Sequence, residues 1–322
     1  MITGPIERAP MAHPVQQLHH VTATVDQAQP DLDFCERLLG LRLVKRTVNF
    51  DNHSVYHFYY GTESGVPGTI WTTFPYHGWG VPPGTHGAGQ VVATAFSVPA
   101  GALQFWRARL LASGVQVAEG APRFGERVLA ARDPSGLVLE LVEEARDARP
   151  PWSGGIPPDA AVRGIHAVTL LLHARGPTIE LMTGALGFRI LREEGARTRL
   201  AAGADAPGHL VDLVEDAEAP SARNGLGTVH HVAFAIGSDE AQLALRADLL
   251  ARGRDVTEVR DRTYFRSIYF REPGGVLFEV ATTAPGFGVD EPLSELGRSL
   301  RLPPWEEPHR VGIEATLPRL DR

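Results

Sequence analysis

Two stretches of the chain share one pattern of apolar and polar positions. Residues 133–141 read Asp-Pro-Ser-Gly-Leu-Val-Leu-Glu-Leu, and residues 272–280 read Glu-Pro-Gly-Gly-Val-Leu-Phe-Glu-Val. In both, an acidic residue and a proline begin a turn, glycine completes it, and an apolar strand carrying one carboxylate follows. The pattern indicates an internal repeat.

The elements before this turn repeat as well. Each copy begins with an apolar strand, continues with a helix that ends at a glycine, and then has further strands. The opening strands are expected at 90–98 and 229–236, the helices at 102–113 and 240–252, and the terminating glycines are Gly114 and Gly253. The repeating unit is therefore one strand, one helix and three strands.

Two more copies fit the same pattern. One begins at Leu18, and the other begins at Gly164. We therefore predict an α+β fold of four βαβββ modules arranged as two mixed-sheet, cupped half-barrel-like domains. The expected segments are a flexible N-terminus (1–15), an N-terminal domain with modules 1 and 2 (16–145), a Pro/Gly-rich linker (146–162), a C-terminal domain with modules 3 and 4 (163–284) and a tail (285–322).

The repeat allows the metal-binding capacity of each module to be compared at two positions, one on the opening strand and one on the closing strand. In module 1 the two positions are His20 and Thr72, and in module 2 they are a residue near Val92 and Glu140. In module 3 they are Ala167 and Asp212, and in module 4 they are His231 and Glu279. Only modules 1 and 4 supply imidazoles. If these two modules pack together, two histidines and one carboxylate form the donor set of non-haem Fe(II) oxygenases, with coordination positions left open. Glu140 and Asp212 are then remnants or structural carboxylates.

His20 and His231 each follow another histidine, so the alternation of side chains along a strand must decide which histidine of each pair is the metal ligand. Successive side chains of a strand point to opposite faces. His20 shares a face with Thr22, whereas His19 falls on an apolar face; His231 and His230 divide in the same way. The apolar face should be buried, which selects His20 and His231 for the cavity. His19 and His230 fit either a supporting role beside the ligands or hydrogen-bonded core positions.

With these modules and histidines, the chain resembles the vicinal-oxygen-chelate (glyoxalase/bleomycin resistance/dioxygenase) superfamily. Within it, the chain is similar to Fe(II)-dependent hydroquinone ring-cleaving dioxygenases. The residues that carry the similarity are 18–22 (Leu-His-His-Val-Thr), 41–50, 56–61 (Tyr-His-Phe-Tyr-Tyr-Gly), 67–69 and 229–231 (Val-His-His). The resemblance implies the metal ligands His20, His231 and Glu279. It also implies Fe(II), with Mn(II) admitted by the same donors, and the cleavage by O₂ of a small aromatic substrate of para-hydroquinone type.

The resemblance further implies Arg262 and Tyr269 as pocket residues, with Thr22 and His230 around the ligands. Arg262 would stabilise negative charge on a phenolate or an oxygen adduct, and Tyr269 would donate a hydrogen bond or pass a proton. The alternatives are a surface arginine and a tyrosine that only packs in the sheet. The roles of His57 and of the loop 75–89, which contains His77 and His86, stay open.

Composition and charge bear on the partners and the cellular location of the protein. The formal charge of −7, with dispersed Lys and Arg, gives no reason to expect nucleic acid or an anionic membrane as a partner. The chain shows no signal peptide or membrane-spanning run, and its one cysteine, Cys35, excludes an intrachain disulfide. We therefore expect a cytoplasmic protein with Cys35 packed in a helix. Homo-oligomerisation is left open.

Two other functions compete with the dioxygenase. A glyoxalase-like isomerase would use a metal as a Lewis acid, but such sites present two carboxylates, and Thr72 stands where the second would be. A metal-free binding or resistance protein of the same fold has no reason to keep His20, His231 and Glu279 at matching repeat positions. The metal content of the purified protein distinguishes these functions.

Overall fold

The computed structural model describes residues 15–120, 122–152 and 154–321. Of the expected flexible N-terminus, residues 1–14 lie outside the described residues. The four predicted modules are present, each with an opening strand, a helix and three further strands. Module 1 contains β1 (Gln17–Val25), α1 (Ala28–Leu32), the π-helical segment η1 (Asp33–Leu38), β2 (Arg42–Asn49), β3 (Asn52–Gly61) and β4 (Ile70–Pro75).

The other three modules repeat this order. Module 2 contains β5 (Gln90–Val98), α2 (Leu103–Ala112), β6 (Val117–Glu119), β7 (Val128–Arg132) and β8 (Val138–Glu143). Module 3 contains β9 (Gly164–Leu172), α3 (Gly176–Gly184), β10 (Arg189–Glu194), β11 (Arg197–Ala201) and β12 (Leu210–Glu215). Module 4 contains β13 (Thr228–Ile236), α4 (Asp239–Ala251), β14 (Arg260–Asp261), β15 (Arg266–Arg271) and β16 (Leu277–Thr282).

The chain leaves helices α2 and α4 through the glycines that the sequence indicated. Gly114 and Gly253 have φ angles of 74° and 75°. This left-handed conformation is strained for residues with a Cβ atom but open to glycine. Each helix can therefore end sharply and return its chain to the sheet.

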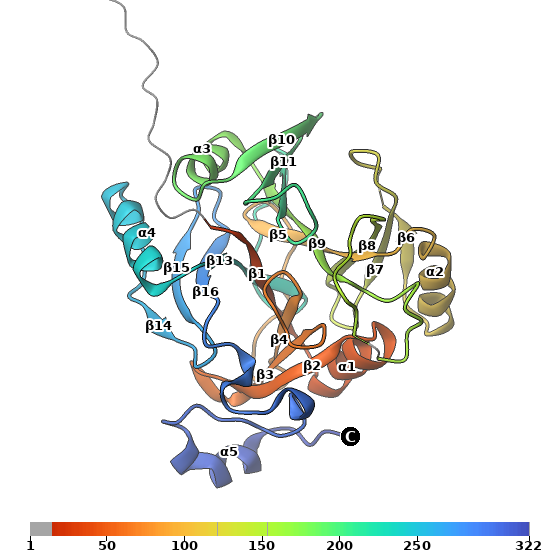
Figure 1. Cartoon of the computed structure of the whole chain (residues 1–322), viewed down its shortest axis with the longest axis vertical. Coiled ribbons are helices and arrows are strands. Elements are labelled where there is room, and N and C mark those ends of the chain that lie inside the picture. The colour runs from red at the N-terminus through yellow and green to blue at the C-terminus, as the bar shows by residue number, and fades with distance from the viewer. Residues whose placement is uncertain (1–14, 121, 153, 322) are drawn as a thin grey trace, which may run out of the picture.

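The strands form two eight-stranded mixed sheets (Figure 1). The first has the order β14-β15-β16-β13-β1-β4-β3-β2, and the second has the order β10-β11-β12-β9-β5-β8-β7-β6. Antiparallel pairing of β1 with β13 joins modules 1 and 4, and pairing of β5 with β9 joins modules 2 and 3. The sheets therefore do not correspond to the two halves of the sequence, because each contains one module from each half.

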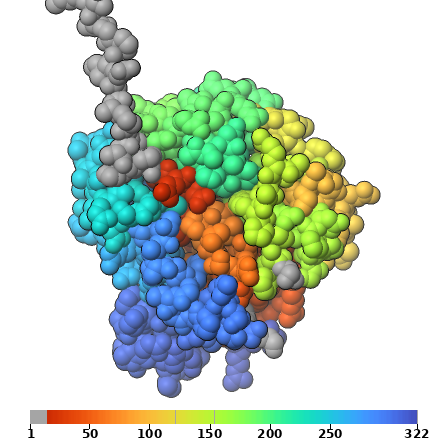
Figure 2. Space-filling view, viewed as in Figure 1, coloured from red at the N-terminus to blue at the C-terminus, as the bar shows by residue number. Residues whose placement is uncertain are grey.

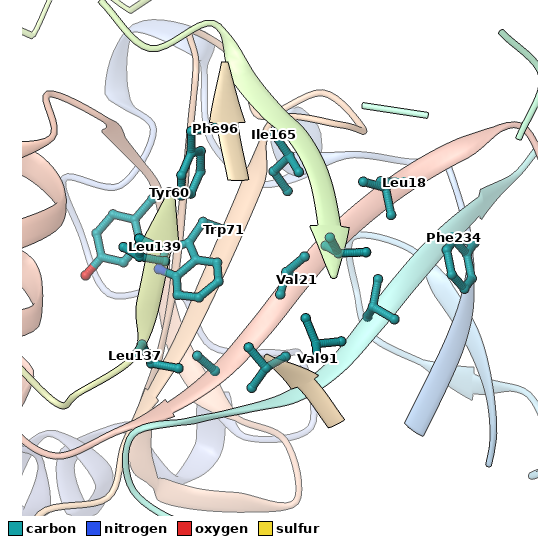
Figure 3. Close-up of a cluster of buried hydrophobic side chains, with 14 of the residues drawn as sticks. Leu18, Val21, Tyr60, Trp71, Val91, Phe96, Leu137, Leu139, Ile165 and Phe234 are labelled. Carbon is teal, nitrogen blue, oxygen red and sulfur yellow. The ribbon is translucent and has the colours of Figure 1, made fainter. Parts of the chain in front are cut away.

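Apolar side chains of both sheets form a shared core (Figure 3). Val21 of β1 and Trp71 of β4 lie near Phe96 of β5 and Ile165 of β9, and the exposed fraction of each is 1% or less. Burial of this surface removes a large apolar area from water and fixes the sheets against each other. The opposite face of the first sheet is thereby left to enclose a separate cavity.

The helices and the tail lie on the outside (Figures 1 and 2). The tail carries the 3₁₀ segments η2 (Phe287–Val289), η3 (Leu293–Glu295) and η4 (Glu307–His309) and the helix α5 (Arg310–Thr316). It is attached to β2 through the buried Lys45, whose ammonium contacts Asp290 and Glu291 at 2.5 Å each. None of the helices in the described part of the chain combines the length and apolarity that a bilayer crossing needs.

Candidate metal centre

Three side chains from opposite ends of the sequence meet inside the first sheet. His20 lies on β1, His231 on β13 and Glu279 on β16, and one ligand atom of each lies within 4.8 Å of the others. Glu279 Oε2 is 2.8 Å from His231 Nε2 and 3.2 Å from His20 Nε2. The exposed fractions of the three residues are 5% or less. The residues that parity and the repeat selected are therefore the ones that the fold brings together.

Irregular strand pairing places both histidine pairs in this cluster. The register between β1 and β13 shifts between Leu18 and His20, and again opposite His230. At such a bulge two residues of one strand oppose one residue of the other, so strict alternation of side chains is lost. The prediction that His19 and His230 occupy the face opposite their neighbours is therefore wrong, because a local bulge overrides parity.

Each candidate ligand is held by the histidine that precedes it. His20 Nδ1 is 2.9 Å from His19 Nδ1, and His231 Nδ1 is 2.8 Å from His230 Nδ1. Both ring pairs have centroids 5.0 Å apart and planes 81° apart. Burial and the adjacent imidazole lower the pKa of His19 and of His230 to about 3. A neutral outer ring can accept the Nδ1 proton of the inner ring, which leaves the inner Nε2 lone pair free for a cation.

The geometry around Glu279 fits a bound cation. Its Oε1 accepts a hydrogen bond from Ser267, which fixes the carboxylate. The buried Oε2 lies within contact distance of both imidazole Nε2 atoms but accepts no well-aligned hydrogen bond among the described residues. Burial alone would raise the pKa of Glu279, but the two imidazoles hold it well below its ordinary value. An ionised, unpartnered carboxylate oxygen facing two imidazole nitrogens is costly without a positive charge. Two imidazoles and one carboxylate match the donor set of mononuclear iron sites.

A cavity of about 180 Å³ opens from this cluster. Its wall combines aromatic rings with a few polar groups, the composition typical of small-molecule sites. The lining residues outside the ligand set are Asn49, Phe50, Asp51, His57, Tyr59, Phe74, Tyr76, His230, Arg262, Phe265 and Tyr269. The cavity therefore leaves one side of the ligand cluster accessible to a substrate.

Arg262 and Tyr269 lie together on this wall. Tyr269 is in register with Glu279 on the neighbouring strand. Arg262 Nε donates to Tyr269 Oη at 3.0 Å, and its Nη2 contacts Asp51 at 3.1 Å. Burial together with Glu279 raises the pKa of Tyr269, so the phenol keeps its proton. The position of Arg262 is therefore not that of a surface arginine.

Thr22 does not line the cavity, although the resemblance places it near the ligands. Thr72 donates its hydroxyl proton to Thr22 at 2.8 Å, and His57 Nε2 is 2.9 Å from Thr72 Oγ1. Because the single proton of Thr72 is used toward Thr22, His57 Nε2 must be the donor in this contact. Thr22 thus contacts the cavity through Thr72 and His57, and His57 lies on the cavity wall itself.

Sequence reasoning missed three polar residues of the cavity wall. Asn49 ends β2, Asp51 lies in the turn after it, and Tyr76 is the second residue of the loop 75–89. In the sequence these residues are only polar residues at or just after the ends of strands. The pattern of one sequence does not distinguish such residues from ordinary turn residues. His77 contacts Asp26 at the surface instead, and neither it nor His86 lines the cavity.

The second sheet shows what the same positions look like without imidazoles. Glu140 and Asp212 pair with Ala95 and Thr169, the same register that Glu279 has with Ala233. Guanidinium groups, which cannot ligate a cation, occupy the space between them. The ion pairs are Arg123 with Glu140, Arg199 with Asp212 and Glu126, and Arg197 with Asp212. This cluster agrees with the interpretation of Glu140 and Asp212 as structural carboxylates.

Comparison with known proteins agrees with this architecture. MhqE of Bacillus subtilis (strain 168), named as a candidate ring-cleaving dioxygenase, is 44% identical over 94% of this chain and 98% of its own length. The chlorohydroquinone/hydroquinone 1,2-dioxygenase of Sphingobium indicum is 37% identical over 91% of this chain and 93% of its own length. A crystal structure of a candidate dioxygenase from Bacillus subtilis superposes with a TM-score of 0.91 at 41% identity, covering 96% of this chain and 99% of that one.

The family assignment follows from a match over two long segments. The model of the Glyoxalase/Bleomycin resistance protein/Dioxygenase superfamily matches residues 17–141 and 176–280. These segments contain His20, His231 and Glu279. The chain belongs to the glyoxalase/bleomycin resistance protein/dioxygenase superfamily.

Proposed function

We propose that the protein is a ring-cleaving dioxygenase that uses a mononuclear Fe(II) site to open a para-hydroquinone-type aromatic ring. The observation that carries this proposal is the cluster of His20, His231 and Glu279, whose unpartnered Glu279 Oε2 faces the cavity-side imidazoles. His20, His231 and Glu279 would hold the iron, and this donor set is the one that leaves coordination positions for substrate and O₂ in non-haem iron enzymes. When bound, the iron supplies Lewis acidity toward a phenol oxygen and the electrons that activate O₂.

The residues of the chain orient the substrate and stabilise charge. Arg262 carries its positive charge over the Tyr269 ring, with the guanidinium carbon 5.3 Å from the ring centroid. It is therefore placed to stabilise negative charge that develops on an oxygen of the substrate. Tyr269 remains protonated beside Glu279, and because its oxygen accepts from Arg262, its proton is left for a hydrogen bond to a bound substrate.

His57 and His230 complete the polar part of the wall. His57 is fixed by Thr72, and it packs against Tyr59 and Phe74 with ring centroids 3.9 and 4.2 Å away. Its Nε2 proton is directed to Thr72, so its Nδ1 remains a hydrogen-bond acceptor. Burial lowers the pKa of His57 well below its ordinary value, which keeps the ring neutral. A neutral imidazole beside the cavity can accept a hydrogen bond from a substrate hydroxyl, which orients the substrate.

The size of the cavity favours a substrate with one ring. An engineered apolar cavity of about 150 Å³ in another protein holds one benzene molecule. The cavity here, of about 180 Å³, therefore has room for one ring with small substituents. A relative that shares 37% of its residues is named as acting on chlorohydroquinone and hydroquinone, which supports this substrate class.

An oxygen-uptake assay tests the proposal. The protein is loaded with Fe(II) without oxygen and then given air-saturated buffer with hydroquinone, chlorohydroquinone, methylhydroquinone or catechol. We expect stoichiometric oxygen consumption with the para-hydroquinones and ring-opened products that have gained both atoms of ¹⁸O₂. No uptake by a fully iron-loaded protein would contradict the dioxygenase function. Activity with zinc or nickel on a thiohemiacetal, without oxygen uptake, would instead support the glyoxalase-like isomerase.

A further inference from the structure

The far end of the cavity presents one hydrogen-bond donor that no described residue uses. Asn49 Oδ1 accepts the backbone N–H of Asp51 at 2.9 Å, which fixes the orientation of the Asn49 amide. Its Nδ2 must then be the donor to Tyr76 Oη, 2.8 Å away. Because the phenol oxygen accepts this bond, the proton of Tyr76 is left to point elsewhere. Tyr76 lines the cavity, and its hydroxyl has no acceptor among the described residues.

The register of the strands places this donor opposite the ligand cluster. Thr22 of β1 is in register with His231 on one side and with Thr72 of β4 on the other. From Thr72, Phe74 continues along the same face of β4 in the direction away from His20, and Tyr76 follows directly after the strand with its ring centroid 6.2 Å from that of Phe74. Both line the cavity. The cavity therefore extends from the ligands, past Phe74, to the hydroxyl of Tyr76.

Asn49 and the surrounding groups keep this hydroxyl in place and protonated. Asn49 is buried, with an exposed fraction of 7%. Burial raises the pKa of Tyr76, with a further contribution from Asp51, while the bond from Asn49 opposes this shift. The carboxylate of Asp51 is engaged by Arg262 and Arg260 at 3.1 and 3.3 Å. The end of the cavity thus offers a neutral O–H donor.

We propose that Tyr76, held by Asn49, recognises the substrate oxygen para to the hydroxyl at the ligand cluster. This inference rests on the proposed function and makes it more specific. A single aromatic ring with one oxygen at the His20, His231 and Glu279 cluster directs its para substituent away from that cluster and toward Tyr76. A hydroxyl there accepts the free proton, whereas a methyl group of similar size leaves the donor without a partner. Tyr76 is therefore a specificity residue that does not touch the reacting carbon.

The test compares two ligands and two proteins without turnover. The Fe(II)-loaded protein is titrated without oxygen by calorimetry with hydroquinone and with 4-methylphenol, which replaces the para hydroxyl by methyl. We expect Tyr76→Phe to weaken hydroquinone binding about three- to tenfold, as the loss of one neutral hydrogen bond does. Binding of 4-methylphenol should change by less than about twofold. The matched control is Tyr56→Phe, which removes a hydroxyl that donates to the Pro318 carbonyl outside the cavity.

A second variant and the oxygen assay separate the possible failures. Asn49→Ala keeps the Tyr76 hydroxyl but removes the amide that holds it, so it should also weaken the binding of hydroquinone more than the binding of 4-methylphenol. Thermal melts show whether each variant is folded. Equal effects on both ligands, or no effect on either, would overturn the inference, as would wild-type protein that binds hydroquinone no more tightly than 4-methylphenol. Failure of the proposed function has a different signature: the selective binding persists, but no oxygen is consumed when air is admitted.

Discussion

At the scale of single residues, the candidate site depends on where lone pairs and protons point. His19 and His230 have lowered pKa values because they are buried beside another imidazole, and each contacts the Nδ1 atom of a candidate ligand. Ser267 binds one oxygen of Glu279 and leaves the other free. Such supporting contacts fix ligand tautomer and orientation, and their loss typically lowers metal affinity about 10- to 100-fold. The cluster is therefore preorganised for a cation.

The negative charge of Glu279 can be removed from the cluster by a substitution that keeps the shape of the side chain. Glu279→Gln keeps the size of the side chain and removes its negative charge. We expect the iron content to fall about tenfold or more, with oxygen uptake lost in parallel. Glu140→Gln is the matched control, because Glu140 has the same register in the second sheet but pairs with Arg123. An active Glu279→Gln protein with a full iron load would refute the ligand assignment.

A second residue-scale prediction concerns the pH dependence of stability. Burial raises the pKa of Asp31 to about 7, although hydrogen bonds from Thr73 and Tyr60 oppose this shift. The folded state therefore holds this proton at pH values where the unfolded state, with a pKa near 3.8, has lost it. The contribution of Asp31 to stability is complete below the unfolded value and is lost as the pH rises toward 7, with a slope of up to about 1.4 kcal/mol per pH unit.

Asp31→Asn isolates this contribution. The free energy of unfolding of the wild type should fall relative to that of the variant between pH 4.5 and 7, because the amide does not titrate. Urea unfolding at several pH values in this interval measures the difference. Parallel pH profiles for the two proteins would show that the Asp31 carboxyl does not titrate differently in the folded state.

Cys35, whose thiol lies 3.9 Å from Asp31, is buried in helical segment η1 as the sequence predicted.

At the scale of elements, the same βαβββ module serves two purposes. In the first sheet, irregular pairing of β1 with β13 gathers four histidines around one carboxylate. In the second sheet, β9 and β12 present the same register, but Arg199 lies between Asp212 and Glu126. Its exposed fraction is 1%. The strands thus provide a frame, and the residues at two positions decide between a ligand cluster and an ion-pair cluster.

The ion-pair cluster should be structural. Arg199→Met removes the guanidinium and leaves the buried carboxylate of Asp212 with fewer partners, so we expect a loss of about 3–5 kcal/mol of unfolding free energy. Urea unfolding measures it, and the iron content should stay at the wild-type value. Arg192→Met, on the neighbouring strand β10 and 44% exposed at the side chain, is the control and should change stability by less than about 0.5 kcal/mol. Loss of iron in a folded Arg199→Met protein would contradict the separation of the two clusters.

At the scale of the whole molecule, the site exists because the first and last modules pair. β1 and β13 lie side by side at the centre of the first sheet, although more than 200 residues separate them (Figure 1). The contact of His20 with Glu279 therefore links the first module to the last. A cation held between them would connect modules 1 and 4 directly, so metal binding and global stability are coupled.

Metal removal tests this coupling. Fe(II) binds the folded state preferentially, so at about 100 times its dissociation constant it should stabilise the protein by about 2.7 kcal/mol. Anaerobic thermal melts with Fe(II) and after treatment with a chelator should therefore differ, with the higher Tm for the loaded protein. Glu279→Gln should abolish this difference. An equal increase in the Tm of Glu279→Gln would show that the metal binds elsewhere.

The sequence by itself determined the four modules, because the turn, glycine and apolar-strand pattern is local and repeats. It also determined the candidate ligands, since only modules 1 and 4 carry His20 and His231 at matching positions and Glu279 closes the last module. Only the tertiary structure decided that β1 pairs with β13, that bulges bring His19 and His230 to the ligand side, and that Asn49 and Tyr76 end the cavity. Strand pairing and bulges depend on contacts between distant segments, and these contacts leave no periodic trace in one sequence.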